Sequence, residues 1–398
     1  MLGFLLALAT LQGTTHPEWN PPAIDFSSRP LPVFEEEPEI ERKWYGDVAT
    51  LGGQQVTLKG QVVNQINGVS PWRTATFEDV RVVNPGSMFA VGVDAAMPPL
   101  MPGETFFSSS RPQPWMGWMA FRNCYFGPTP GDESWQGYGG KMWLHPQSNH
   151  SLYLVGCNFA PVREHAVYAE WPRHIYIDQC FFMDTGGNPI QIASRLGDGS
   201  SYVNGNPLCP PAGWNGWAVI RNIEIREKYH GFRDASDISF FGFMGPIVLE
   251  GVRIHNTVSA LAIQSDTYKG TWVANGDSIP WSSPRPYRQS DGDPPEGVFT
   301  HKEVWVDDFR VLSEEEVQNV NKPMLMFSGI GELNIGTFEV PGRISINNEF
   351  GGPFPCGEVR FYDAESVWAH EGRIGTFDPE LDKFRPYNTE ELEALIVQ

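Results

Sequence analysis

An eight-residue pattern that recurs along the chain constrains the fold more than any other feature of the sequence. In Leu152 to Phe159 (LYLVGCNF), apolar residues occupy positions 1, 3, 6 and 8, and Gly156 at position 5 interrupts the alternation. Ile175 to Phe182 repeats the pattern with Gln179 at position 5. Alternation with a period of two predicts a β-strand with one buried face, and the interruption predicts a sharp bend between two short strands.

Seven such octets align without gaps, and an eighth and a degenerate ninth follow them. Their first residues are Ala75, Met119, Leu152, Ile175, Ala218, Ile247, Val304, Leu333 and Val359. Position 5 of the first eight holds Asp79, Asn123, Gly156, Gln179, Asn222, Gly251, Asp308 and Thr337. Because Asn, Asp and Gly tolerate left-handed backbone conformations, we expect a tight corner at each position 5. Asp307 and Asp308 are accordingly interpreted as structural corner residues.

Three of the five cysteines, Cys124, Cys157 and Cys180, fall at position 6 of consecutive octets. Other octets place Val, Ile or Phe there, so we expect the three thiols to be buried and stacked in one ladder. A metal site or a disulfide is the alternative. Cys209 and Cys356 lie outside the ladder, and the sequence leaves open whether they pair.

A third short strand lies between successive octets. It is visible at residues 89–94, 142–145, 166–170, 189–195, 238–243, 260–266, 324–327 and 343–347. One such strand plus one octet gives three strands per repeat, which is the unit of a right-handed parallel β-helix. Over roughly residues 60–365, this repeat resembles the pectate-lyase-like superfamily of right-handed β-helices. Lyases, hydrolases, phage tailspikes, adhesins and inert spacers share the pattern, so the resemblance implies a fold rather than an activity.

We therefore predict an all-β protein built as one single-stranded right-handed parallel β-helix, with long loop insertions and short capping helices. Residues 1–13 form a candidate signal segment, 14–50 a Pro-rich and acidic arm with an N-terminal cap, 51–368 the β-helix, and 369–398 a tail with a capping helix. A short helix is expected around Glu36 to Trp44. A second helix is expected after Asn388 or Thr389, because Glu391 follows at the spacing of a capping box.

The net charge of −20 argues against nucleic acids and anionic membranes as partners, since both are polyanions. The N-terminal run MLGFLLALATLQG is apolar but too short to span a bilayer as a helix. It is typical of a secretory signal, although no Lys or Arg precedes it. These features favour a secreted or cell-surface protein without a membrane span, and they leave the oligomeric state open.

Functional side chains of a β-helix must point outward, because the inward ones fill the core. The resemblance implies a groove over the strands that precede the octets. With Val167, Ile190 and Leu261 inward, we expect outward rows of neighbouring residues on successive coils. The first row is Tyr168, Gln191 and Ala262, the second His145, Glu170, Ala193, Phe241 and Gln264, and the third Arg195, Phe243 and Asp266.

This registration places His145 beside Glu170 and Trp143 beside Tyr168, with Arg195 one coil further along. A His–Glu pair can transfer protons near neutral pH, Arg can hold a carboxylate or an oxyanion, and aromatic faces suit sugar rings. The predicted catalytic residues are His145, Glu170 and Arg195. The predicted substrate-binding residues are Trp143, Tyr168, Gln191, Gln264, Asp266, His230, Arg233 and Asp234. An ordinary solvated sheet surface is the alternative.

The last three of these residues belong to a dense mixed-charge segment, EKYHGFRDASD, and Arg163, Glu164 and His165 are expected to line the same edge. The sequence contains none of the usual zinc, phosphate-loop or serine-hydrolase motifs. Asp291 and Asp293 in QSDGDPPEG resemble a calcium loop with an incomplete ligand set, so calcium is the one cofactor considered.

The functional prediction is an exported carbohydrate-active or carbohydrate-binding protein whose partner is a polysaccharide or glycan. Lyase and glycoside hydrolase chemistry both remain open. A lyase would use Arg195 to neutralise a uronate and His145 as the base, whereas a hydrolase would need a second carboxylate besides Glu170, with Asp266 or Asp234 as the nearest. The alternative is a non-catalytic structural or adhesive β-helix on a cell surface or virion.

Overall fold

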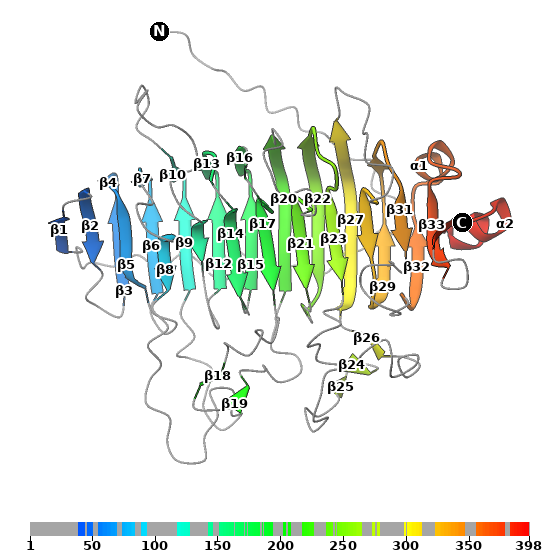
Figure 1. The fold of residues 1–398 in the computed structure, drawn as a ribbon, viewed down its shortest axis with the longest axis horizontal. Helices are drawn as coiled ribbons and strands as arrows, with labels where there is room; N and C mark the ends of the chain where they lie inside the picture. The colour runs from blue at the N-terminus through cyan, green and yellow to red at the C-terminus, as the bar shows by residue number, and fades with distance from the viewer. Residues whose placement is uncertain are drawn as a thin grey trace, which may run out of the picture.

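The chain is wound into a solenoid of parallel β-strands, and its coils follow one another along the long axis in sequence order (Figure 1). This confirms the predicted all-β architecture. The computed structural model describes residues 39–43, 46–50, 55–69, 74–83, 89–93, 118–127, 142–145, 151–162, 164–170, 172, 174–183, 185, 187–193, 202–203, 206–207, 217–226, 236–241, 243, 245–264, 273–274, 277–278, 298–299, 301–312, 323–346, 356–378 and 383–397.

The strands that precede the octets form a 13-stranded sheet, here called sheet A. In spatial order they are β1 (Glu39–Lys43), β2 (Gly46–Thr50), β5 (Gln65–Val69), β8 (Phe89–Val93), β11 (Met142–His145), β14 (His165–Glu170), β17 (Ile190–Ala193), β21 (Ile238–Phe241), β23 (Leu261–Gln264), β28 (Leu325–Phe327), β31 (Ile344–Ile346), β33 (Ile374–Asp378) and β34 (Lys383–Pro386). The first and last strands pair antiparallel with their neighbours, and all the pairs between them are parallel.

The octets form a 16-stranded sheet, here called sheet B. Its strands are β3 (Gln55–Lys59), β4 (Val62–Val63), β6 (Thr74–Glu78), β7 (Arg81–Val82), β9 (Trp118–Arg122), β10 (Tyr125–Phe126), β12 (Ser151–Val155), β13 (Asn158–Phe159), β15 (His174–Asp178), β16 (Phe181–Met183), β20 (Trp217–Arg226), β22 (Ile247–His255), β27 (His301–Leu312), β29 (Ile330–Ile335), β30 (Phe338–Glu339) and β32 (Glu358–Phe361). The remaining strands form two small sheets, β18 (Tyr202–Val203) with β19 (Asn206–Pro207), and β24 (Val273–Ala274) with β25 (Asp277–Ser278) and β26 (Val298–Phe299).

The first residues of all nine octets pair with one another from coil to coil, as the sequence alignment predicts. The pairing continues one coil earlier, because Val56 lies opposite Ala75. The stretch from Val56 to Val63 is thus a further octet, with Gly60 at position 5 and a φ of 66°.

Position 5 is a left-handed corner in seven of the eight predicted octets. Its φ is 65° at Gly156 and 64° at Gly251, and it is also positive at the non-glycine residues Asp79 (55°), Asn123 (52°), Gln179 (55°), Asn222 (51°) and Asp308 (47°). Thr337 does not adopt this conformation. The corner prediction is therefore confirmed except at Thr337, the one β-branched residue in the set.

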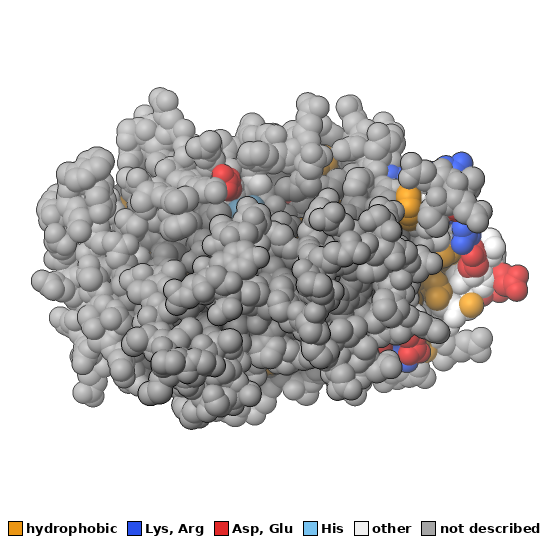
Figure 2. Space-filling view, turned by 60° about the horizontal axis from the view of Figure 1, so that its bottom comes forward, with side chains coloured by type: hydrophobic (Ala, Val, Ile, Leu, Met, Phe, Trp, Pro, Cys, Tyr) orange, Lys and Arg blue, Asp and Glu red, His pale blue; other side chains and the backbone are white. Residues whose placement is uncertain are grey.

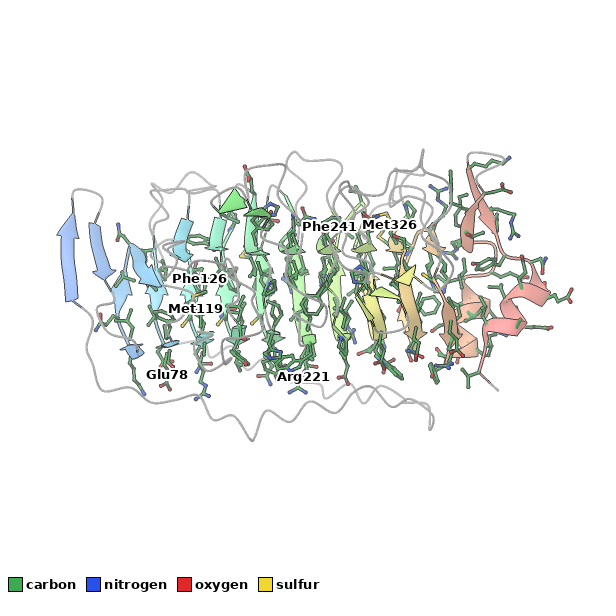
Figure 3. All side chains as sticks on the ribbon, turned by 90° about the horizontal axis from the view of Figure 1, so that it is seen from below. Glu78, Met119, Phe126, Arg221, Phe241 and Met326 are labelled. Atoms are coloured by element: carbon green, nitrogen blue, oxygen red, sulfur yellow. The ribbon has the colours of Figure 1, made fainter. Side chains whose placement is uncertain are left out.

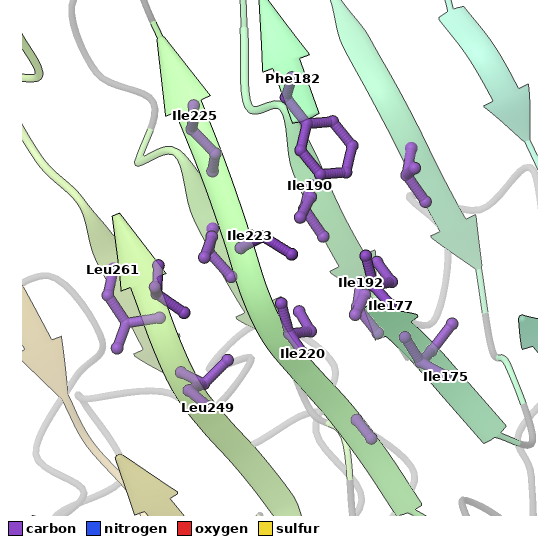
Figure 4. Close-up of a cluster of buried hydrophobic side chains, with 14 of the residues drawn as sticks. Ile175, Ile177, Phe182, Ile190, Ile192, Ile220, Ile223, Ile225, Leu249 and Leu261 are labelled. Carbon is purple, nitrogen blue, oxygen red and sulfur yellow. The ribbon is translucent and has the colours of Figure 1, made fainter. Parts of the chain in front are cut away.

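Inward side chains from both sheets form one continuous core. Phe126, Phe159 and Phe182 stack on successive coils, with ring centroids 4.6 and 4.8 Å apart and the rings almost parallel. Figure 4 shows aliphatic residues such as Ile177 and Ile192 packed in the same way between the sheets. In Figure 3, Met119 and Phe126 lie between the sheets, whereas Glu78 and Arg221 project from the outer side of sheet B.

The helix expected around Glu36 to Trp44 is wrong, because residues 39–43 form strand β1 antiparallel to β2. Pairing gives hydrogen-bond partners to β2, which would otherwise be the outermost strand of sheet A, and this tertiary demand overrides local helix preference.

The C-terminal helix is confirmed as α2 (Thr389–Leu395), with Asn388 as N-cap in a capping box with Glu391. Its Leu392 is fully buried against the last coil. A second helix, α1 (Ala364–Ala369), replaces the latter half of the ninth octet, because Asp363 at position 5 accepts hydrogen bonds from the first helical amides. Figure 2 shows charged and hydrophobic side chains together at this C-terminal end.

The left-handed corners can be tested at Gln179, which is exposed and has φ of 55°. We expect Gln179→Val to lower the free energy of unfolding by about 1–2 kcal/mol, because a β-branched side chain clashes in this conformation. Gln179→Gly should stay within about 0.5 kcal/mol of the parent, since Gly adopts positive φ without strain. Urea unfolding measures both, with Asn158→Val on the exposed side of β13 as the control. Equal stability of the Val and Gly variants would contradict the corner assignment.

Candidate functional site

The register of sheet A differs from the predicted one at β11. Met142 pairs with His165 and Leu144 with Val167, so the next position pairs His145 with Tyr168. The prediction that His145 lies directly beside Glu170 is therefore wrong by two residues. A four-residue strand that reads Met-Trp-Leu-His has no clear alternation, so its sequence does not fix which residues face inward.

Trp143 belongs to the core, and the prediction that it faces outward to bind substrate is wrong. Its side chain is fully buried, and its ring lies 6.2 Å from that of Phe126. The indole Nε1 donates a hydrogen bond to the carbonyl oxygen of Ala160 at 2.8 Å. This bond satisfies the polar atom that a buried tryptophan carries and holds the ring inside.

One outward row of sheet A is accessible over only part of its length. The row runs from Tyr168 through Gln191, Ser239, Ala262 and Met326 to Ser345. Tyr168 and Gln191 are partly exposed, whereas the four residues after them are only 1–3% exposed. Among the described residues, the open part of this row therefore lies on β14 and β17, which carry two of the predicted contact residues.

Gln264 is buried beside β28, where its side-chain Nε2 lies 3.8 Å from the sulfur of Met326. It belongs to the second predicted row and was predicted to bind substrate, but its side chain is buried. Arg195, His230, Arg233, Asp234 and Asp266 lie outside the described residues, as do Cys209 and the candidate calcium ligands Asp291 and Asp293. The side chains of His145 and Glu170 are also outside what the structure describes.

His165 stands at the beginning of β14, at the edge of the open region. Its Nδ1 lies 2.9 Å from the carbonyl oxygen of Asn188, and its ring lies 5.2 Å from that of Tyr168. The sequence indicates only that His165 lines this edge. Its contacts come from a turn one coil away, which no local pattern reveals.

The outer face of sheet B carries a row of charged residues that sequence reasoning did not select as a site. Asp178, Arg221, Glu250 and Asp307 are direct partners on successive coils. The carboxylate of Asp178 accepts hydrogen bonds from Tyr176, Arg221 and Asn222. These contacts tie neighbouring coils together, so we interpret Asp178 as structural.

Asp307 faces the next coil, where its Oδ1 accepts the Thr337 amide at 2.8 Å and lies over Gly336, which has no side chain to collide with it. Burial raises the pKa of Asp307. It also raises the pKa of Glu250, and the charge of Asp307 adds to this increase. The neighbouring Asp308 binds Arg253 at 2.6 Å, so both aspartates hold the corner together as predicted.

The thiol ladder is confirmed, since Cys124, Cys157 and Cys180 are buried free thiols on successive coils. The pKa of Cys124 is raised by its hydrogen bond with Cys157 and by burial, and burial raises the pKa of Cys157 well above its usual value. No group of three or more metal-ligating side chains occurs among the described residues.

The ladder predicts that Cys157 does not react in the folded protein, because a buried thiol with a raised pKa supplies almost no thiolate. Iodoacetamide at mildly alkaline pH, followed by peptide mass spectrometry, should leave Cys157 unmodified in buffer. The same treatment in denaturant should label it completely. Labelling of Cys157 before unfolding would contradict the ladder.

A second buried titratable group is His301, whose ring nitrogens lie 2.7 and 2.9 Å from the carbonyl oxygens of Phe243 and Gln264. Burial lowers its pKa to about 4, although the two carbonyls oppose the shift. The His301 imidazole of the unfolded chain therefore becomes protonated below about pH 6.5, whereas that of the folded chain stays neutral down to about pH 4.

Stability should fall as the pH decreases through this window, by up to about 3 kcal/mol from His301 alone. Urea unfolding across the window, compared between the parent and His301→Asn, isolates this contribution. The variant should show a shallower dependence on pH than the parent. An unchanged slope in His301→Asn would show that the imidazole titrates normally.

In comparisons with known proteins, no family model, no curated protein and no solved structure matches the chain. Among the described residues, the structure contains no helix long and apolar enough to cross a membrane. Function must therefore be argued from the residues of this chain.

Proposed function

We propose that the protein is an exported, right-handed parallel β-helix of the pectate-lyase-like kind, and that it binds a polysaccharide over β11, β14 and β17 of sheet A. The observation that carries the proposal is the coincidence of two independent features. The outward row of sheet A is accessible at Tyr168 and Gln191 and buried beyond them. Glu170, which the sequence selects, lies on β14, and His145 lies on the neighbouring strand β11.

The chemistry of this region suits a sugar chain. The Tyr168 ring offers a face for a pyranose, and the Gln191 amide both donates and accepts hydrogen bonds to hydroxyl groups. His145 and Glu170 lie on neighbouring strands at positions offset by two residues, so one extended ligand along sheet A would pass both positions.

Cleavage of the bound chain is a further step of the proposal. Elimination would use His145 as base with Arg195 neutralising the uronate, and hydrolysis would use Glu170 with a second carboxylate from Asp266 or Asp234. Secretion under the direction of residues 1–13 belongs to the same proposal, and the contributions of His230 and Arg233 remain proposals too.

The alternative is a non-catalytic structural or adhesive β-helix. It is favoured by the small or apolar outward residues Ser239, Ala262, Met326 and Ser345, which are buried rather than presented to solvent. It is also favoured by the charged row of sheet B, where Asp178 and Asp307 are engaged in contacts between coils.

The test is binding and turnover of a panel of acidic and neutral polysaccharides by the purified protein, with and without calcium. Tyr168→Ala should weaken binding about 3- to 10-fold, the value of one aromatic contact. Glu170→Gln and His145→Ala should abolish any turnover, scored as unsaturated product or as new reducing ends. Glu339→Gln, an exposed carboxylate on β30, is the matched control.

Binding that survives Tyr168→Ala unchanged would move the site away from sheet A. Absence of binding to every polysaccharide would remove the carbohydrate proposal and leave the structural β-helix.

A further inference from the structure

The tautomer of His165 follows from its hydrogen-bond partner. Nδ1 lies 2.9 Å from the carbonyl oxygen of Asn188. Because a carbonyl oxygen only accepts hydrogen bonds, Nδ1 must carry the proton, and Nε2 carries the lone pair in the neutral ring. Histidines that serve as bases or ligands are oriented in this way by a carbonyl or carboxylate behind them.

The turn beside the His165 imidazole contains Gly187, whose lack of a side chain leaves space for the ring. A Cβ on Gly187 would lie 2.7 Å from the carbonyl oxygen of Glu164 and 3.2 Å from Cε1 of His165. Any other residue at this position would displace the imidazole or the backbone beneath it. Gly187 therefore shapes the place that His165 occupies.

Asn188, which supplies the carbonyl, is itself fixed by a buried polar seam. Its side-chain Nδ2 donates to the Ser236 carbonyl and to the Ser239 hydroxyl, both at 2.6 Å. The Ser236 hydroxyl lies 2.8 Å from that of Ser259, which donates to the Pro323 carbonyl at 3.2 Å. The seam crosses several coils and ends at the imidazole, so the ring is held by the body of the solenoid rather than by a loop.

His165 also lies where a ligand on sheet A would pass. Its side chain is partly exposed, and its ring lies 5.2 Å from that of Tyr168, the first residue of the accessible row. Glu164 and Tyr168 are the titratable groups described beside it on its own segment. Met142 of β11, opposite in register, and Gly187 and Asn188 of the following coil carry no charge.

We propose that His165 is a ligand-contacting residue of this site, with Nε2 accepting a hydrogen bond from a sugar hydroxyl and Asn188 acting as its positioning residue. The inference rests on the proposed polysaccharide binding and adds a residue to it. Protonation converts Nε2 from an acceptor into a donor, so a sugar hydroxyl that donates to the neutral ring must turn to accept from the charged one, and the strength of the contact changes with pH.

The experiment measures the affinity of the full chain for the best-binding polysaccharide of the panel between about pH 8 and pH 5, the range in which an imidazole changes charge. Affinity of the parent should change several-fold across this range, because the contact differs between the neutral and the charged ring. His165→Gln keeps a polar side chain that does not titrate, so its affinity should be lower at neutral pH and nearly constant with pH. His255→Gln, on the outer face of sheet B, should reproduce the parental profile.

Nitrogen-15 NMR of the histidine rings measures which nitrogen of His165 carries the proton, and it needs no ligand. The signal lost in His165→Gln should belong to a ring protonated at Nδ1 at neutral pH. Asn188→Gly, which keeps the carbonyl but removes the side chain that fixes it, should increase the share of the other tautomer.

The outcomes separate the two proposals. Polysaccharide binding whose pH profile is unchanged in His165→Gln would overturn the role of His165 and leave the proposed function standing. A dominant Nε2-protonated tautomer in the parent would also overturn it, because Nε2 would then be a donor. No binding by the parent protein would overturn the proposed function, and the ligand contact of His165 with it.

Discussion

The parallel hydrogen-bonded register between successive coils is the constraint on which the rest of the structure depends. Parallel strands place equivalent residues directly above one another, so a residue type that suits position 1 of one octet suits position 1 of all of them. This is why phenylalanine rings stack face to face along the core, and why the carboxylates of sheet B contact backbone and side chains one coil away. A left-handed corner of constant geometry keeps the register from drifting.

Sequence reasoning reaches the fold wherever the repeat is long enough to fix the register. The octets are eight residues with four apolar positions, and a slip of one residue would turn Leu152 and Ile175 to solvent, so their alignment has one solution. The strand β11 is too short for that argument, since Trp143 and Leu144 are both apolar and both buried. The indole hydrogen bond to Ala160 satisfies the buried Trp143, and it is a contact between elements that no local pattern reports.

The same difference between local patterns and long-range contacts determines how much of the candidate site could be predicted from the sequence. The outward direction of Tyr168 and Gln191 follows from alternation within β14 and β17, which the sequence displays. The importance of His165 could not follow from it, because the residue sits at a strand end and is oriented by Asn188, more than twenty positions away. Helix α1 was missed for a related reason: Asp363 resembles any other corner residue until its carboxylate is seen capping amides.

The antiparallel strands at the two ends of sheet A give the molecule a property that its repeating interior lacks. A stack of identical parallel strands has no internal reason to stop, since each edge is a template for one more strand in the same direction. At β1 and β34 the chain runs the other way. A further coil that continued the direction of the interior strands would have to pair antiparallel at either end, so the repeating parallel pattern of sheet A cannot continue unchanged past β1 or β34.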